Sequence, residues 1–190
     1  MGKIVLGLIA DTHIPDRAGG LRPDILPIFR AAGVTTILHA GDVSVPAVLT
    51  ELETVAPVHA VRGNRDIYRL RALPMTRLLD FEGVTVGLAH GQGNLWFYLH
   101  EKLRVYTVGY SLAFYLGYLH KTFPTAQAIV FGHSHQPIIH QSRGKLIINP
   151  GSACCPDMKH PPSVALLHLE NGKATGELVW LKKQVSPHRP

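Results

Sequence analysis

Residues of the kinds that bind metal ions recur along this sequence, each just after a short apolar run. The set consists of Asp11, His13, Asp42, Asn64, His90, His133 and His135. Carboxylate oxygens combined with imidazole nitrogens suit zinc, manganese, iron or nickel, and the lack of thiolates argues against a structural zinc finger. These donors are too many for one tetrahedral ion but fit two ions if a carboxylate bridges them. Paired ions of this kind hydrolyse phosphoesters, so the sequence predicts a dinuclear hydrolytic centre.

No single motif in the set is specific. The Gly-His-x-His motif at 132–135 occurs by chance in unrelated chains, and a lone histidine is more often a core or surface residue. An aspartate before a helix is more often an N-cap, and Asn64 on its own could be a turn residue. The combined pattern is much more specific for a metal site, because the clusters follow one another in order and each comes after a predicted strand.

The elements that must position these residues alternate in the first part of the chain. We predict strands over 3–10, 35–40 and 58–62, with helices over 22–32 and 46–55 between them. This alternation indicates βαβ units and a parallel sheet. Ligands of such sheets bind beyond the carboxyl ends of the strands, so the polar clusters are expected to meet at one rim.

The second part of the chain is mostly β. Residues 76–81 and 84–89 flank Glu82-Gly83 and are expected to form a hairpin. Further strands are expected over 128–131, 137–141, 145–148, 163–169 and 174–181. We therefore predict an α/β fold with two mixed sheets face to face and helices outside. It forms a single domain over residues 1–182, followed by a short C-terminal tail over 183–190.

One aromatic-rich segment, 95–121, interrupts the strands and is expected to be helical. Its stretch from Val105 to Leu119 has no charged residue, but 15 residues are too few to span a bilayer. Two interpretations stay open. The segment is either a helix packed on the sheet, or a cap near the site or a contact surface for a homo-oligomer.

Composition excludes several classes of protein. A chain of 190 residues with 46% hydrophobic and 17% charged residues is long and apolar enough to fold as one domain without disulfides. No apolar run reaches the length of a membrane span, so we predict no membrane association and a cytoplasmic location. The net charge of +6 favours anionic partners such as phosphates, nucleotides or nucleic acid, although the basic residues are scattered.

Taken together, the motifs resemble the calcineurin-like metallophosphoesterases. The resemblance is carried by Asp11-x-His13, Gly41-Asp42, Gly63-Asn64, His90 and Gly132-His133-x-His135. The segments 38–42 and 149–152 are similar to the small bacterial and archaeal phosphodiesterase branch of that family. The similarity covers residues 3–152 and implies a four-layer α/β/β/α sandwich.

The resemblance also implies a distribution of ligands between two divalent ions. The first ion is assigned to Asp11, His13 and His135, the second to Asn64, His90 and His133, and Asp42 bridges them. A carboxylate suits the bridging position because it has two oxygens, whereas each imidazole offers one nitrogen. The family implies manganese, and zinc, iron, nickel and magnesium stay open because availability decides the metal more than ligand type.

The sequence departs from the family pattern at Arg65. Many relatives have a histidine there that is thought to protonate the leaving group or bind phosphate. Arginine keeps its proton, so it cannot act as a general acid, but it can bind phosphate oxygens with two hydrogen bonds. We therefore predict that Arg65 faces the substrate beside the catalytic residues Asp42 and Asn64, and that Asp66 is a candidate to orient it. After His90, relatives often have a second histidine where this chain has Gln92.

These features together predict a metal-dependent phosphodiesterase acting on a small phosphoester or nucleotide, with nucleic acid as a further possible substrate. A phosphomonoesterase acting on nucleotides or phosphoproteins is the alternative within the same chemistry. A non-catalytic scaffold on this fold is a third hypothesis, and it is disfavoured because every expected metal ligand is present.

Overall fold

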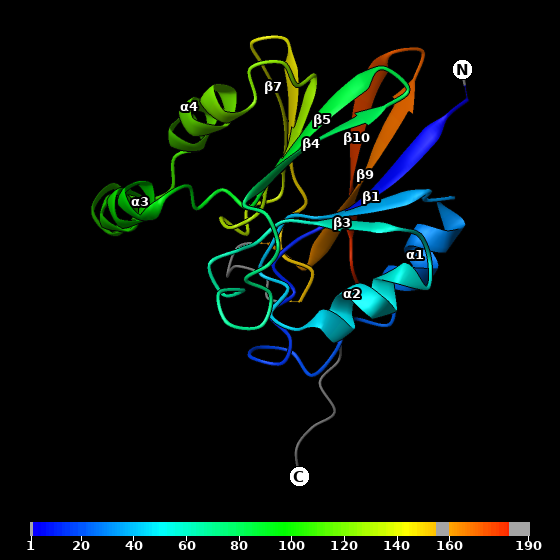
Figure 1. Cartoon of the computed structure of the whole chain (residues 1–190), viewed down its shortest axis with the longest axis horizontal. Coiled ribbons are helices and arrows are strands. Elements are labelled where there is room, and N and C mark those ends of the chain that lie inside the picture. The colour runs from blue at the N-terminus through cyan, green and yellow to red at the C-terminus, as the bar shows by residue number, and fades with distance from the viewer. Residues whose placement is uncertain (1, 155–159, 183–190) are drawn as a thin grey trace.

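The computed structural model describes residues 2–154 and 160–182 and contains two five-stranded sheets (Figure 1). The first sheet has the order β10 (Lys173–Trp180), β9 (Ser163–Glu170), β1 (Ile4–Ile9), β2 (Thr36–His39) and β3 (Val58–Ala60). The second has the order β4 (Thr76–Phe81), β5 (Val84–Ala89), β6 (Ala128–Val130), β8 (Lys145–Asn149) and β7 (Ile138–Ser142). The predicted tail at 183–190 lies outside the described residues.

Both sheets are mixed, as the sequence predicts. In the first, β1, β2 and β3 are parallel, whereas β9 is antiparallel to both of its neighbours, β1 and β10. In the second, β5, β6 and β8 are parallel, and the edge strands β4 and β7 are antiparallel to their neighbours. The parallel strands are near-continuous apolar runs because both of their faces are covered.

Three apolar clusters separate four layers and confirm the predicted sandwich. Between the sheets, residues such as Leu8 and Leu88 are fully buried. Outside the first sheet lie α1 (Ile25–Ala31) and α2 (Pro46–Glu53), which bury Phe29 and Leu52 against it. Outside the second sheet, α4 (Leu112–Thr122) buries Leu119 against strands β6 and β8.

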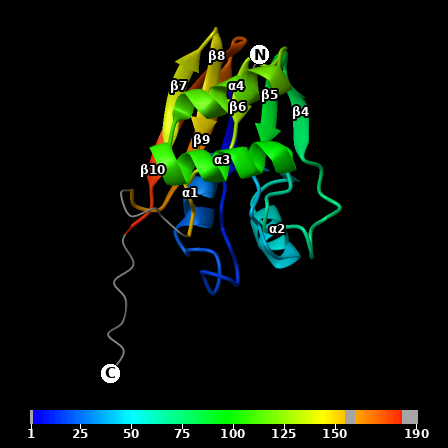
Figure 2. The same cartoon turned by 90° about the vertical axis from the view of Figure 1, so that its left-hand side faces the viewer.

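The segment predicted as one helical stretch is two helices. The helix α3 (Leu95–Val108) ends at Gly109, whose φ of +89° is the left-handed conformation that glycine adopts at low cost. Figure 2 shows α3 and α4 on the same outer side of the second sheet. Phe97 of α3 stacks on Phe114 of α4 with ring centroids 4.5 Å apart.

The first interpretation of this segment, packing on the sheet, is confirmed for α4. The helix α4 packs on the sheet, whereas the outward face of α3 stays exposed, with Trp96 at 79% and Tyr106 at 95% exposure. The contact with a second copy that the sequence suggests would form on this face, and it stays a prediction. In the part of the chain that the structure describes, no helix is both long and apolar enough for a membrane span.

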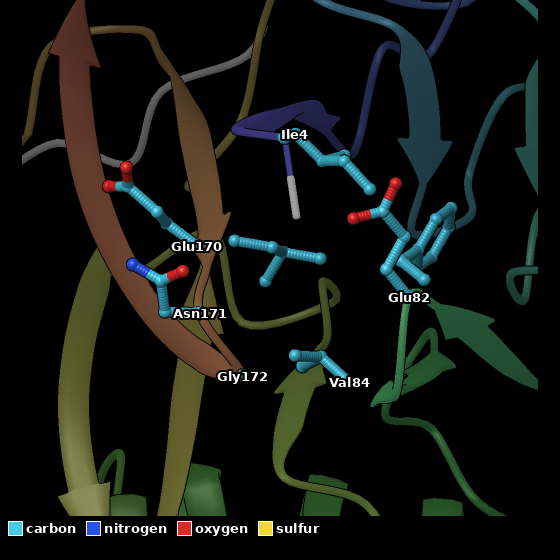
Figure 3. A pocket seen from close by; sticks show the side chains of 9 residues that line it. Ile4, Glu82, Val84, Glu170, Asn171 and Gly172 are labelled. Carbon is cyan, nitrogen blue, oxygen red and sulfur yellow. The ribbon is translucent and has the colours of Figure 1, made fainter.

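A small hollow lies at the end of the sandwich where β1 and β5 begin. Figure 3 shows Ile4, Val84 and Gly172 around it, together with Glu82 and Glu170. Its volume of about 10 Å³ is only about what one water molecule requires. This end is therefore closed, and the site predicted from the sequence lies where β1 and β5 finish.

Candidate metal centre

The predicted ligands gather at the carboxyl ends of strands from both sheets. The first sheet supplies Asp11, His13, Asp42 and Asn64 from the loops after β1, β2 and β3, and the second supplies His90, His133 and His135 from the loops after β5 and β6. All of these strand ends meet because the sheets pack face to face with their parallel strands directed to one rim. The structure thus brings together all the residues that the sequence singled out as ligands.

One group of ligand atoms surrounds Asp11. The nitrogen His135 Nε2 lies 3.2 Å from Asp11 Oδ1 and 3.2 Å from His13 Nε2. His13 Nε2 in turn lies 3.7 Å from Asp11 Oδ1. These three residues offer atoms that all lie within 4.8 Å of one another, a spacing that one cation can fill.

A second group surrounds His90. Its Nε2 lies 3.2 Å from Asn64 Oδ1, 3.5 Å from Asp42 Oδ1 and 4.0 Å from Asp11 Oδ1. Its other nitrogen, Nδ1, lies 2.7 Å from the backbone oxygen of Ala40, so Nε2 is the nitrogen presented to the site. The His133 ring lies beside this group, with its centroid 5.0 Å from that of His90.

The carboxylate of Asp42 lies between the two groups. While Oδ1 faces His90, Oδ2 lies 3.8 Å from His13 Nδ1. Asp11 also belongs to both groups of candidate ligands. The arrangement therefore gives two carboxylates flanked by two sets of imidazoles, which is a donor set that fits cations.

Buried polar atoms without partners support this fit. Asp11 Oδ1 and His13 Nδ1 are buried, and neither has a hydrogen-bond partner of acceptable geometry among the described residues. Burying a carboxylate without compensation is costly. Two imidazole nitrogens 3.2 Å apart, both of which also face Asp11, add to this cost unless one is protonated or a cation lies between them. One divalent ion could accept Asp11 Oδ1, His13 Nε2 and His135 Nε2 at once, because each residue offers one ligand atom to this group.

Several of the predicted ligands have strained backbones. Positive φ values between 49° and 67° occur at Asp11, His13, Asp42, His133 and His135. Residues with side chains rarely adopt this region, and each instance costs about 1 kcal/mol or more. Backbone hydrogen bonds hold the first two loops in this form, from Asp11 N to Gly41 O and from His13 N to Asp42 O. Such strain is typical of functional sites and was not predicted from the sequence.

The segment 149–152 braces the ligand loops from behind. The side chain of Asn149 donates to the Gly132 backbone oxygen at 2.8 Å, and Ser152 Oγ donates to the Asp11 backbone oxygen at 2.8 Å. His39 lies beneath the site, where its Nδ1 accepts from Gly41 N at 3.2 Å. The side chains of these residues bind backbone atoms of the ligand loops and so position the loops.

Gly63 allows the loop after β3 to pass directly over Asp42. A methyl group at this position would overlap both the Asp42 carboxylate and its backbone nitrogen. We expect Gly63→Ala to lower turnover by about 100-fold, because small displacements of reacting groups have effects of this size. Metal content and activity would be measured beside Gly19→Ala, whose added methyl group meets nothing within 4 Å. Equal loss in both variants would contradict this expectation.

Burial and neighbouring charges shift the pKa values of the residues in this site. Burial opposes protonation of His90, but the charge of Asp42 and the contact with its carboxylate raise the His90 pKa to about 9. Burial acts to raise the pKa of Asp42, yet the charge of His90 and the contact with its imidazole keep it well below its usual value. Burial lowers the pKa of His13 to about 4, so this ligand is already neutral at pH 7.

Metal affinity is therefore expected to rise between pH 7 and pH 9. A cation must displace the proton of His90, and this competition weakens as the pH approaches the His90 pKa of about 9. The affinity gain is at most about tenfold per pH unit for one displaced proton. Calorimetric titrations in buffers of different ionisation enthalpy would count the protons released. A pH-independent affinity would show that His90 is neutral before the metal arrives.

A cavity of about 230 Å³ opens above the ligands. It is lined by His13, Asp42, Asn64, His133, Ser134 and His135, together with the basic side chains of Arg17, Arg65 and Lys102. The Arg65 guanidinium lies 3.7 Å from the carboxylate of Asp16. The expectation that Asp66 orients Arg65 is wrong, because Asp66 is fully buried and accepts hydrogen bonds from Ser44 N and Gly63 N instead.

Sequence reasoning missed Arg17, Lys102 and Glu101 at this site. Arg17 follows the first ligand loop, and its backbone nitrogen donates to His13 O at 2.8 Å. Glu101 and Lys102 lie on α3, and Glu101 is 3% exposed. Glu101 stands beside Lys102 in the sequence, so nothing local marked it as a buried carboxylate.

The comparisons with known proteins agree with this geometry. The model of the calcineurin-like phosphoesterase superfamily domain matches residues 4–172. A probable metallophosphoesterase of Methanothermobacter thermautotrophicus is 38% identical, over 93% of this chain and 92% of its own length. A phosphodiesterase of Methanocaldococcus jannaschii is 24% identical, over 87% of this chain and 93% of its own. The crystal structure of Entamoeba histolytica Vps29 complexed with zinc has a TM-score of 0.68 at 22% identity, covering 93% of this chain and 98% of that one.

Proposed function

Because this chain belongs to the calcineurin-like phosphoesterase superfamily, we propose that it hydrolyses phosphodiester bonds with the help of two divalent metal ions. The observation that carries the proposal is the position of Asp42. Its two carboxylate oxygens face different imidazoles, His90 at 3.5 Å and His13 at 3.8 Å. A carboxylate so placed suits a bridge between two ions.

In this proposal Asp11, His13 and His135 hold the first ion, and Asn64, His90 and His133 hold the second. Manganese is the metal that we expect first, with zinc, iron, nickel and magnesium as alternatives to be compared. When bound, such a pair lowers the pKa of water toward neutrality and neutralises charge on phosphoryl oxygens. No covalent intermediate on the protein is required.

The basic side chains around the cavity would bind the substrate. Arg65, Arg17 and Lys102 come from three separate segments and line the same cavity as the ligands. Arg65 would bind the non-bridging phosphate oxygens, because a guanidinium matches two of them at once. It would act by charge and orientation alone, since arginine does not release its proton. A small phosphoester or a nucleotide fits this anion-binding rim, and nucleic acid is a further candidate.

The proposal predicts an order of preference among simple substrates. With Arg65 in place of an acid, the leaving group departs without a proton from that position. Aryl diesters, whose leaving groups are stable as anions, should therefore be cleaved faster than alkyl diesters. The basic side chains around the cavity also favour substrates that carry a negatively charged phosphate at the reacting position.

Metal analysis followed by a phosphoester panel tests this function. The purified protein would be stripped of metal, loaded with each divalent ion in turn, and assayed with aryl phosphate diesters and monoesters. Two ions per chain and faster turnover of the diester would support the proposal. Faster turnover of the monoester would favour a phosphomonoesterase instead. Full loading without turnover of either substrate would favour the non-catalytic scaffold.

A further inference from the structure

The helix α3 carries one buried carboxylate, and it points to the metal centre. Glu101 is 3% exposed, whereas Leu99 and Leu103 on the same helix are 50% and 65% exposed. Glu101 Oε1 accepts a hydrogen bond from the Tyr115 hydroxyl at 2.8 Å. Its other oxygen, Oε2, lies 3.4 Å from His133 Nε2. Both carboxylate oxygens are therefore engaged by buried neighbours.

The contact with Glu101 determines which nitrogen of His133 is left for a metal ion. A neutral imidazole has one N–H and one lone pair, and a carboxylate can only accept. A hydrogen bond to Glu101 therefore places the proton on Nε2 and leaves the lone pair on Nδ1. The main chain holds His133 from the other side, because its N–H donates to Asp11 Oδ2 at 3.0 Å.

We propose that Glu101 is a positioning residue, which holds His133 with its Nδ1 lone pair toward the second ion and thereby makes α3 part of the metal centre. This inference rests on the dinuclear site proposed above. Metal-ligating histidines commonly donate their second ring nitrogen to a carboxylate, which fixes the ring and makes it a stronger ligand. Tyr115 in turn holds Glu101, so the support runs from α4 through α3 to the ligand.

The contacts with His133 and Tyr115 also explain why the largely apolar helix α3 contains a buried acidic residue. The neighbouring residues 95–99 and 103–108 are largely apolar, and a buried acid among them costs free energy unless it is paired. Lys102 Nζ lies 3.6 Å from Glu101 Oε2, but its side chain is 53% exposed, so this pair is weak. His133 and Tyr115 are the buried partners that offset the cost of burying Glu101.

Metal titration of Glu101→Gln tests the proposal without an activity assay. Glutamine keeps the shape of the side chain but removes the charge that fixes His133. We expect the second ion to bind about 10–100-fold more weakly, the size seen when such outer partners are lost, and the first ion to bind as before. Glu53→Gln is the matched control, because it makes the same change at an exposed position of α2. Equal affinity for both ions in Glu101→Gln and the wild type would overturn the proposal.

The tautomer of His133 gives a second measurement on the unmodified protein. Long-range proton–nitrogen NMR of the metal-free wild type should place the His133 proton on Nε2. A proton on Nδ1 would overturn the role of Glu101, and this result does not depend on whether any variant folds. If the wild type binds a single ion while the proton is on Nε2, the dinuclear function fails but the Glu101–His133 interaction is supported. The two proposals can therefore fail separately.

Discussion

The variant Asp42→Asn is expected to lose at least about three orders of magnitude in phosphodiester turnover. This corresponds to about 4 kcal/mol of transition-state stabilisation, within the several kcal/mol that a well-placed metal pair supplies. Asparagine keeps one oxygen, which can still accept the hydrogen bond from Arg65 N that Asp42 Oδ1 accepts at 2.8 Å. It loses the second oxygen and the charge, so the proposed bridge between the two ions should be lost while the loop is retained.

The measurements for Asp42→Asn are kcat/KM with an aryl phosphodiester, the metal content per chain and the melting temperature. We expect the metal content to fall from two ions toward one. Glu53→Gln removes one negative charge from an exposed helix and should leave all three unchanged. An Asp42→Asn variant that binds two ions and keeps full turnover would refute the bridging role.

The variant Arg65→Ala is expected to lower kcat/KM by about 100-fold, the effect of removing one preorganised donor from a developing charge. Its metal content should stay at the wild-type value, because the guanidinium belongs to neither ligand group and only the backbone of residue 65 contacts Asp42. Arg65→Lys should recover part of the loss, since lysine keeps the charge but not the two-pronged geometry.

The matched control for Arg65→Ala is Arg69→Ala. Arg69 is exposed in the same loop, and it is not among the residues that line the cavity. Unchanged turnover in Arg65→Ala would show that this side chain only faces solvent. A loss of equal size in Arg69→Ala would show that the effect comes from the overall charge of the loop.

The meeting of the candidate ligands at one rim could be predicted from the sequence because it follows from local pattern. Apolar runs that end in Asp11, Asp42 or His90 predict strands with polar residues at their carboxyl ends, and the geometry of parallel strands brings those ends together. The sandwich follows from the same pattern. The break of the helical stretch could have been expected from Gly109, because glycine is common just past the end of a helix.

The support around the ligands could not be predicted, because it depends on how distant elements pack. Glu101 reaches His133 only once α3 lies against the rim of the second sheet, and nothing in its local sequence specifies that placement. Asp66 follows Arg65 directly and was expected to act on it, yet the loop directs its carboxylate to the backbone of Ser44 and Gly63. Adjacency in sequence was the wrong guide at this position.

The distribution of the ligands over both sheets has a mechanical consequence. The described contacts between the two sheets are mainly packing of apolar side chains, which does not fix one relative orientation. At the rim, each group of candidate ligands combines residues from both sheets. A bound cation would therefore cross-link the two sheets at this rim. Resistance to heat should then follow the free metal concentration by mass action, and a chelator should loosen the sandwich first at that edge.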